Sequence, residues 1–143
     1  MNLVSTADSV TELLERIIDF AEQRRQTLTA NIANVNTPGY VPHDLDVEGF
    51  ADRMTRAVAE YMQSERLVLC DHDNVKFGPR GRLEAAPTPD HEAWRLLESD
   101  TRGYLEQQVG KLAENLINHK VATELLKARQ RTCLHQRSDD RAG

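Results

Sequence analysis

Two segments near opposite ends of the chain carry apolar residues at alternating spacings of three and four, which is typical of one face of an amphipathic α-helix. The first segment predicts a helix over residues 5–35, and the second predicts a helix over residues 99–131 with Pro89 as its earliest start. The first stripe contains Val10, Leu14, Ile17, Ala21, Leu28 and Val35, with Arg24 and Asn31 at its two polar positions, and the second contains Leu105, Val109, Leu112, Leu116, His119, Thr123 and Leu126.

Both stripes are narrow, close to the width of a coiled-coil seam, and the simplest way to bury each is against the other. We therefore expect a mainly α-helical fold in which the long N- and C-terminal helices pair as an antiparallel, coiled-coil-like hairpin. Ile17, Leu28, Leu112 and Leu116 are the expected seam residues. The length fits a single domain over residues 1–143. So small a core should be marginally stable alone, which favours completion by neighbouring subunits.

Residues 36–98 form a middle segment without a sustained hydrophobic period. Apolar positions predict a short helix between Val47 and Met62. Two apolar runs, Leu67–Cys70 and Val75–Phe77, are expected to pair as a hairpin. The other irregular ranges are loops at residues 78–82 and 86–89 and a frayed tail at residues 132–143.

The stretch Ala30–Tyr40, which reads ANIANVNTPGY, predicts the end of the first helix and a defined chain reversal. Asn34 and Asn36 can bond to the terminal carbonyls of a helix, and Asn tolerates the left-handed conformation used there. Pro38 and Gly39 fit the second and third positions of a type II turn, where Gly supplies the positive φ. Taken alone, these features also fit an ordinary helix stop.

The same stretch resembles the signature shared by the axial proteins of the bacterial flagellum, which are the rod, hook and hook-associated subunits. In those proteins a long N-terminal helix ends in Asn-Ile-Ala-Asn-x-x-Thr-Pro-Gly-Tyr. Residues 41–47 are similar to the Asp-x-Asp-aromatic step of proximal-rod proteins, and residues 108–115 and 122–126 resemble their C-terminal helix. The resemblance covers residues 5–50 and 104–130.

The resemblance implies a structural subunit of the proximal rod of the flagellar basal body. It implies export through the flagellar type III apparatus without a cleavable signal peptide, followed by assembly in the periplasm with identical subunits and other rod proteins. The residues expected to carry assembly are the turn residues Asn31, Asn34, Asn36, Pro38, Gly39 and Tyr40 and the four seam residues. Two alternatives remain: another short flagellar axial component, or a soluble helical-hairpin module that presents its stripe to a partner helix.

Composition and charge narrow the classes of partner. The chain is 39% hydrophobic and 5% aromatic, so a core must consist mainly of aliphatic residues and a deep apolar pocket is not expected. Its net charge of −5, with basic residues scattered among acids, argues against nucleic acid as a partner. No apolar run approaches the length of a membrane span, and the N-terminus lacks the pattern of a secretory signal.

No residue pattern indicates catalysis, and we expect no enzyme, no cofactor, no metal and no small-molecule substrate. Residues 71–74 contain metal-like side chains but lack the spacing of a calcium loop, so a polar turn is the better interpretation. Residues 78–82 lack the ending of a phosphate-binding loop. Cys70 and Cys133 belong to no paired motif. The five histidines are dispersed along the chain, and His119 on the second stripe is expected to be partly buried.

Overall fold

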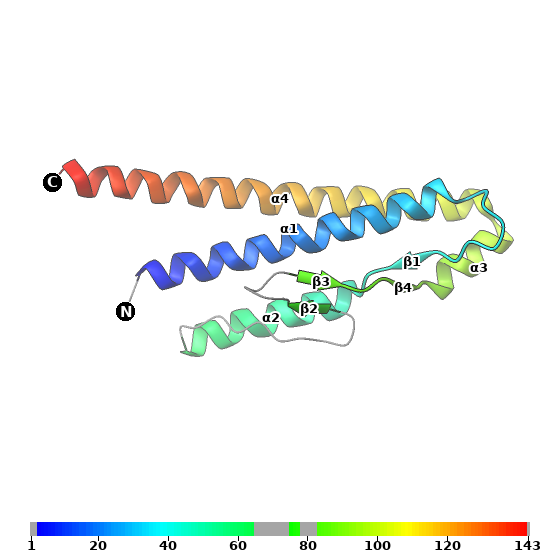
Figure 1. Cartoon of the computed structure of the whole chain (residues 1–143), viewed down its shortest axis with the longest axis horizontal. Helices are drawn as coiled ribbons and strands as arrows, with labels where there is room; N and C mark the ends of the chain where they lie inside the picture. Colours follow the sequence, from blue (N-terminus) through cyan, green and yellow to red (C-terminus); the bar gives the residue numbers. More distant parts are fainter. Residues whose placement is uncertain (1–2, 65–74, 78–82, 143) are drawn as a thin grey trace.

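The computed structural model describes residues 3–64, 75–77 and 83–142. These residues form a mainly helical fold with short strands between the two long terminal helices (Figure 1). The helices are α1 (Leu3–Ala33), α2 (Val47–Ser64), α3 (His91–Ser99) and α4 (Thr101–Ala142), and the strands are β1 (His43–Asp44), β2 (Val75–Phe77), β3 (Leu83–Ala85) and β4 (Thr88–Pro89).

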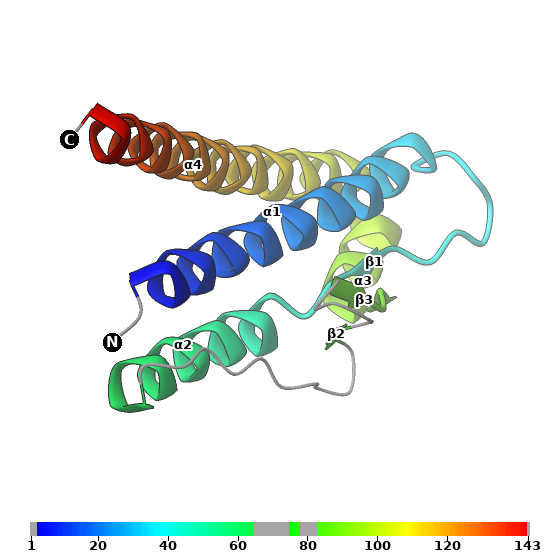
Figure 2. The same ribbon diagram turned by 60° about the vertical axis from the view of Figure 1, so that its left-hand side comes forward.

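α1 and α4 lie side by side and run in opposite directions, so that the start of α1 and the end of α4 lie at the same end of the molecule (Figures 1 and 2). This arrangement confirms the expected pairing of the long terminal helices. In both views α1 lies between α4 on one side and α2 with the β2 and β3 strands on the other. The first helix therefore contacts both halves of the fold.

The middle of the chain contains a strand pairing that we did not predict. β2 pairs antiparallel with β3, with Val75 opposite Ala85 and Phe77 opposite Leu83. The range 67–70, which we expected to pair with β2, lies outside the described residues, as do 71–74 and 78–82. The predicted loop at 86–89 contains β4, which pairs antiparallel with β1, with His43 opposite Pro89 and Asp44 opposite Thr88.

The C-terminal helical region also has different bounds from those predicted. α3 and α4 are separate helices, since the backbone of Asp100 is extended and its carboxylate accepts the Gly103 N–H at 3.0 Å as a helix cap. α4 continues to Ala142, whereas we expected its end near residue 131. Arg141 in the last turn is favourable there, because a basic side chain complements the helix dipole.

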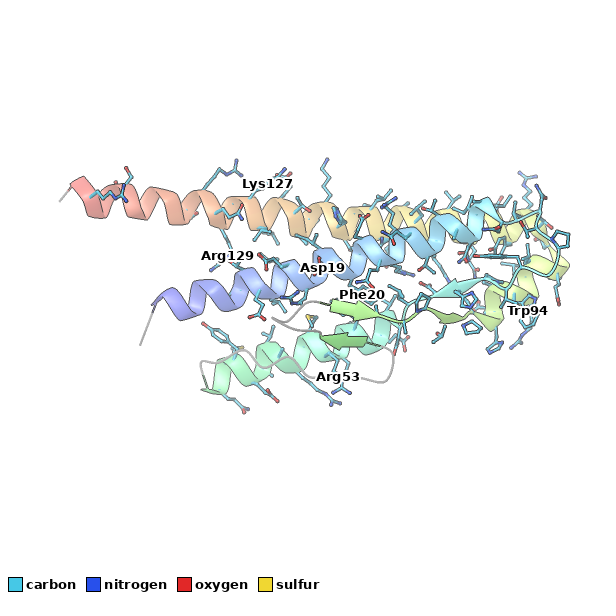
Figure 3. All side chains as sticks on the ribbon, in the orientation of Figure 1. Asp19, Phe20, Arg53, Trp94, Lys127 and Arg129 are labelled. Atoms are coloured by element: carbon cyan, nitrogen blue, oxygen red, sulfur yellow. The ribbon has the colours of Figure 1, made fainter. Side chains whose placement is uncertain are left out.

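A compact apolar cluster lies between α1 and α2. It contains the buried residues Phe20, Leu45, Phe50 and Met54, with Ile17 partly buried against it. The rings of Phe20 and Phe50 are stacked, with centroids 4.0 Å apart and planes inclined by 6°. Figure 3 shows Phe20 on the side of α1 that faces α2 and the strands. α2 begins at Val47, as predicted, and its apolar face completes this cluster.

In the part of the chain that the structure describes, no helix is long and apolar enough to cross a membrane. Within the same described residues, no group of three or more acidic, histidine or cysteine side chains is arranged to hold a metal ion.

Candidate assembly site

The chain reversal after α1 is a turn with one residue at positive φ. Gly39 has φ of +74°, and the Tyr40 N–H donates to the Thr37 carbonyl at 3.2 Å, as the type II turn requires. Asn34 ends the helix by donating to the Ala30 carbonyl at 2.8 Å. Thr37 then donates to the Asn34 side chain at 3.1 Å. The predicted helix stop and turn are therefore present with the predicted chemistry at Asn34 and Gly39.

Asn31, near the C-terminal end of α1, is the centre of a buried polar network. Its side chain is fully buried and donates to the His43 carbonyl at 2.7 Å and to Gln108 Oε1 at 2.8 Å. Its Oδ1 accepts the Tyr40 hydroxyl at 2.9 Å and the His43 N–H at 3.1 Å. The Tyr104 hydroxyl donates to the Asn31 carbonyl at 3.0 Å. We call these contacts the Asn31 network, and they fix the turn, β1 and α4 relative to α1.

The two tyrosines of the network are held in the protonated form. Burial raises the pKa of Tyr104 to about 12, with smaller contributions from Tyr40 and Asp90. Burial also raises the pKa of Tyr40. Because only a protonated hydroxyl can donate a hydrogen bond, both contacts to Asn31 are stable at neutral pH.

A cluster of ion pairs lies next to the network and joins four elements. Arg24 of α1, 7% exposed, donates two hydrogen bonds to Asp44 of β1, at 2.9 and 3.1 Å. Lys111 of α4 contacts Asp44 at 3.5 Å and Asp90, the N-cap of α3, at 2.8 Å. Burial alone would raise the pKa of Asp90, but hydrogen bonds from Lys111 and the Ala93 N–H, with the Lys111 charge, lower it overall. The cluster holds the end of the hairpin together.

The face of α4 that packs on α1 is not the predicted apolar stripe. Asn115 is 3% exposed and donates to the Ala21 carbonyl at 2.7 Å, and Gln108 belongs to the Asn31 network. Polar side chains occupy this face because each finds a partner on α1, and the small Ala122 allows close approach. The buried residues of this face are Tyr104, Gln108, Asn115 and Ala122.

Two other faces of α4 leave apolar side chains in solvent. At about 100° per residue, Leu112 and Leu116 lie roughly 80–120° round the helix from the buried line, and Leu116 is 48% exposed. Val121 and Leu125 lie on the opposite flank and are 53% and 52% exposed. In Figure 3, Lys127, which the helical period places on the flank of Leu116, points away from α1, whereas Arg129, near the buried line, points towards it. The apolar surface of α4 is thus only partly used within this chain.

An apolar cleft of about 450 Å³ lies between α1, α2 and α4 and is open to solvent. We did not expect a pocket of this kind from the composition, and it forms because α4 does not reach α2 across the width of α1. We call it the groove. Its apolar lining includes Ile17, Phe20, Phe50, Met54, Val121 and Leu125.

The structure brings together only some of the predicted assembly residues. Asn31 and Tyr40 are in direct contact, while Asn36, Pro38 and Gly39 are exposed around the turn. Among the expected seam residues, Leu28 is fully buried, Ile17 and Leu112 are partly buried, and Leu116 is half exposed. The sequence interpretation missed several residues that make contacts across elements. Among them are His43, Asp44, Asp90, Tyr104, Gln108, Lys111 and Asn115. The regular spacing of polar residues on the last helix was the signal in the sequence that could have indicated the members of this group on α4.

Comparison with known protein families matches part of the chain. The family described as flagella basal body rod protein matches residues 21–40, a range that includes the last part of α1, Asn31 and the turn through Tyr40. No curated protein and no solved structure matches the chain. The match supports a relation between this part of the chain and the flagellar rod family.

Proposed function

We propose that this chain is a structural subunit of the bacterial flagellar rod, similar to the proximal-rod subunit FlgB, and that it has no catalytic activity. The observation that carries the proposal is the agreement between the family match and the structure over residues 21–40. The matched residues include Asn31, the centre of the buried polar network, and the turn at Gly39. A segment that both matches a rod family and sets the geometry of the hairpin fits a role in packing.

In this proposal, assembly takes place through the terminal helices. The apolar side chains that α1 and α2 leave uncovered on α4 supply contacts for identical or related subunits, including Leu116. Export through the flagellar type III apparatus and placement in the periplasmic part of the rod are parts of the same proposal, and they rest on the resemblance of residues 30–40 to the flagellar axial proteins. The residues of the whole chain, 1–143, would act as one rod domain.

Deletion of the gene, followed by electron microscopy of isolated basal bodies, tests the proposal. We expect basal bodies without a complete rod and cells that do not swim, both restored by the intact gene on a plasmid. The variant Gln63→Ala, at an exposed position near the end of α2, serves as the control and should restore swimming fully. Intact rods in the deletion strain would contradict the proposal and favour a separate adaptor role.

A further inference from the structure

The exposed apolar residues of α4 form a projecting surface on the flank away from the groove. Leu105, Val109, Leu112 and Leu116 follow one another on this flank, and we call them the ridge. Val109 and Leu116 are about half exposed, and Leu105 and Leu112 are partly exposed. The helical period places the ridge roughly half a turn round α4 from the groove residues Val121 and Leu125. One molecule therefore presents a projecting and a hollowed apolar surface in different directions.

The two surfaces match in length. At a rise of about 1.5 Å per residue, the ridge from Leu105 to Leu116 is about 17 Å long. The α4 wall of the groove, from Asn115 to Leu125, is about 15 Å long. A row of Leu and Val side chains fits an apolar cleft of about 450 Å³ without placing a polar group in it.

Exposed charges of opposite sign lie beside the two surfaces. Lys120 is exposed and continues the line of the ridge along α4, whereas Lys127 further along is paired with Glu124 at 3.7 Å. Glu114 is exposed on the groove side of α4, and Glu48 is exposed in the first turn of α2, next to the groove residue Val47. Opposite charges around an apolar contact steer association and disfavour two like surfaces meeting, ridge to ridge or groove to groove.

We propose that the groove of one copy of this chain binds the ridge of a second copy. The contact is head-to-tail, so each copy in the assembly uses both surfaces and presents one free surface at each end. This inference takes its biological setting from the proposed rod function and adds to it the two surfaces through which identical subunits meet.

Sedimentation velocity of the purified full-length chain over a wide range of concentration tests the contact. We expect the wild type to form a progressive series of oligomers, as head-to-tail association produces. Leu116→Glu on the ridge and Leu125→Glu in the groove should each weaken association by about tenfold or more, because each places an unpaired charge in an apolar contact. Ala59→Glu, an exposed position on α2 outside both surfaces, should associate like the wild type.

Mixing the two defective variants gives the decisive measurement. The Leu116→Glu copy keeps its groove and the Leu125→Glu copy keeps its ridge, so their equimolar mixture should stop at a one-to-one dimer. A wild type that stays monomeric, variants that associate like the wild type, or a mixture without heterodimers would each overturn the contact. If circular dichroism shows that a glutamate variant is unfolded, Leu116→Gln and Leu125→Gln replace the pair.

The deletion strain separates this contact from the rod function. Loss of rods together with a monomeric purified chain would overturn the groove-to-ridge contact and leave the rod function in place. Intact rods in the deletion strain, together with association of the purified chain that depends on the ridge, would overturn the rod function and leave the groove-to-ridge contact in place.

Discussion

The two ends of the α1–α4 pair are stabilised by different kinds of side chain. Near the turn, Asn31, Gln108 and Tyr104 are fully buried and hydrogen-bonded to one another or to nearby backbone. Towards the chain termini, Phe20 and Met54 form one wall of a groove that solvent still enters. The hydrogen-bond network of the first end is complete within one chain, whereas the groove of the second end leaves apolar surface to be covered. A subunit that folds first and assembles later needs both kinds of end.

The largest effect is expected at the centre of the polar end. Asn31→Ala removes four side-chain hydrogen bonds and leaves groups of the buried Gln108 and of the partly buried Tyr40 and His43 without them. We expect the free energy of unfolding in urea to fall by about 4 kcal/mol, since each buried unpaired group costs about 1–3 kcal/mol. Asn34→Ala, which loses only local bonds at the helix end, should cost less than about 1 kcal/mol. Equal losses in the two variants would contradict a special role for Asn31.

A smaller loss is expected at the apolar end. Phe20→Ala removes the stacked ring between α1 and α2 and should lower the free energy of unfolding by about 3 kcal/mol. This is the low end for a buried Phe, because the groove beside it lets water occupy the vacated space. Met62→Ala, at a position 77% exposed near the end of α2, should change stability by less than about 0.5 kcal/mol. A loss above that of Asn31→Ala would show that the apolar end dominates the fold.

In the turn that closes the polar end, the cost of replacing Gly39 should depend only on how easily the new residue adopts a positive φ. An added Cβ at Gly39 would meet nothing within 4 Å, so strain at its φ of +74° is the only penalty. Gly39→Val should cost about 2 kcal/mol, and Gly39→Asn distinctly less, because Asn enters the left-handed region more easily. Thermal unfolding of the two variants gives the comparison. Equal changes in melting temperature would mean that positive φ at residue 39 is not required.

The smallest effect is a loss of stability in alkali. The pKa of Tyr104 is raised in the folded state, so its stabilising contribution is complete below its ordinary pKa of 10.0 and is lost as pH rises towards about 12. At pH 11 the free energy of unfolding should be lower by about 1 kcal/mol than at pH 9. Tyr104→Phe should lose this part of the pH dependence. An unchanged profile in that variant would assign the alkaline loss to other groups.

The sequence was sufficient to predict the parts of the fold that depend on local patterns. The apolar period of residues 5–35 predicted α1 and its buried Leu14, Ala21 and Leu28, and the Pro-Gly step predicted the positive φ of Gly39. The stacking of Phe20 on Phe50 was not predicted, because the two rings belong to different helices.

The face of α4 could not be predicted in the same way. Counting apolar residues favoured Leu112 and Leu116, whereas the face on α1 contains Gln108 and Asn115. A polar residue is stable there only when a partner such as Asn31 or the Ala21 carbonyl lies opposite, and such partners are distant in the sequence. The apolar residues of α4 do follow a helical period, but they form a surface that no other part of this chain covers among the described residues.

The positions of the ridge and the groove along α4 have a consequence for the form of an assembly. The midpoint of the ridge, between Leu105 and Leu116, lies nearer the turn than the midpoint of the groove wall, between Asn115 and Leu125. With parallel α4 helices, seating one surface in the other shifts each copy by about 14 Å relative to the last. Repeated shifts in one direction produce an open helical array of subunits, not a flat closed ring. The positions of a few leucines along one helix then set the axial rise from one subunit to the next in this assembly.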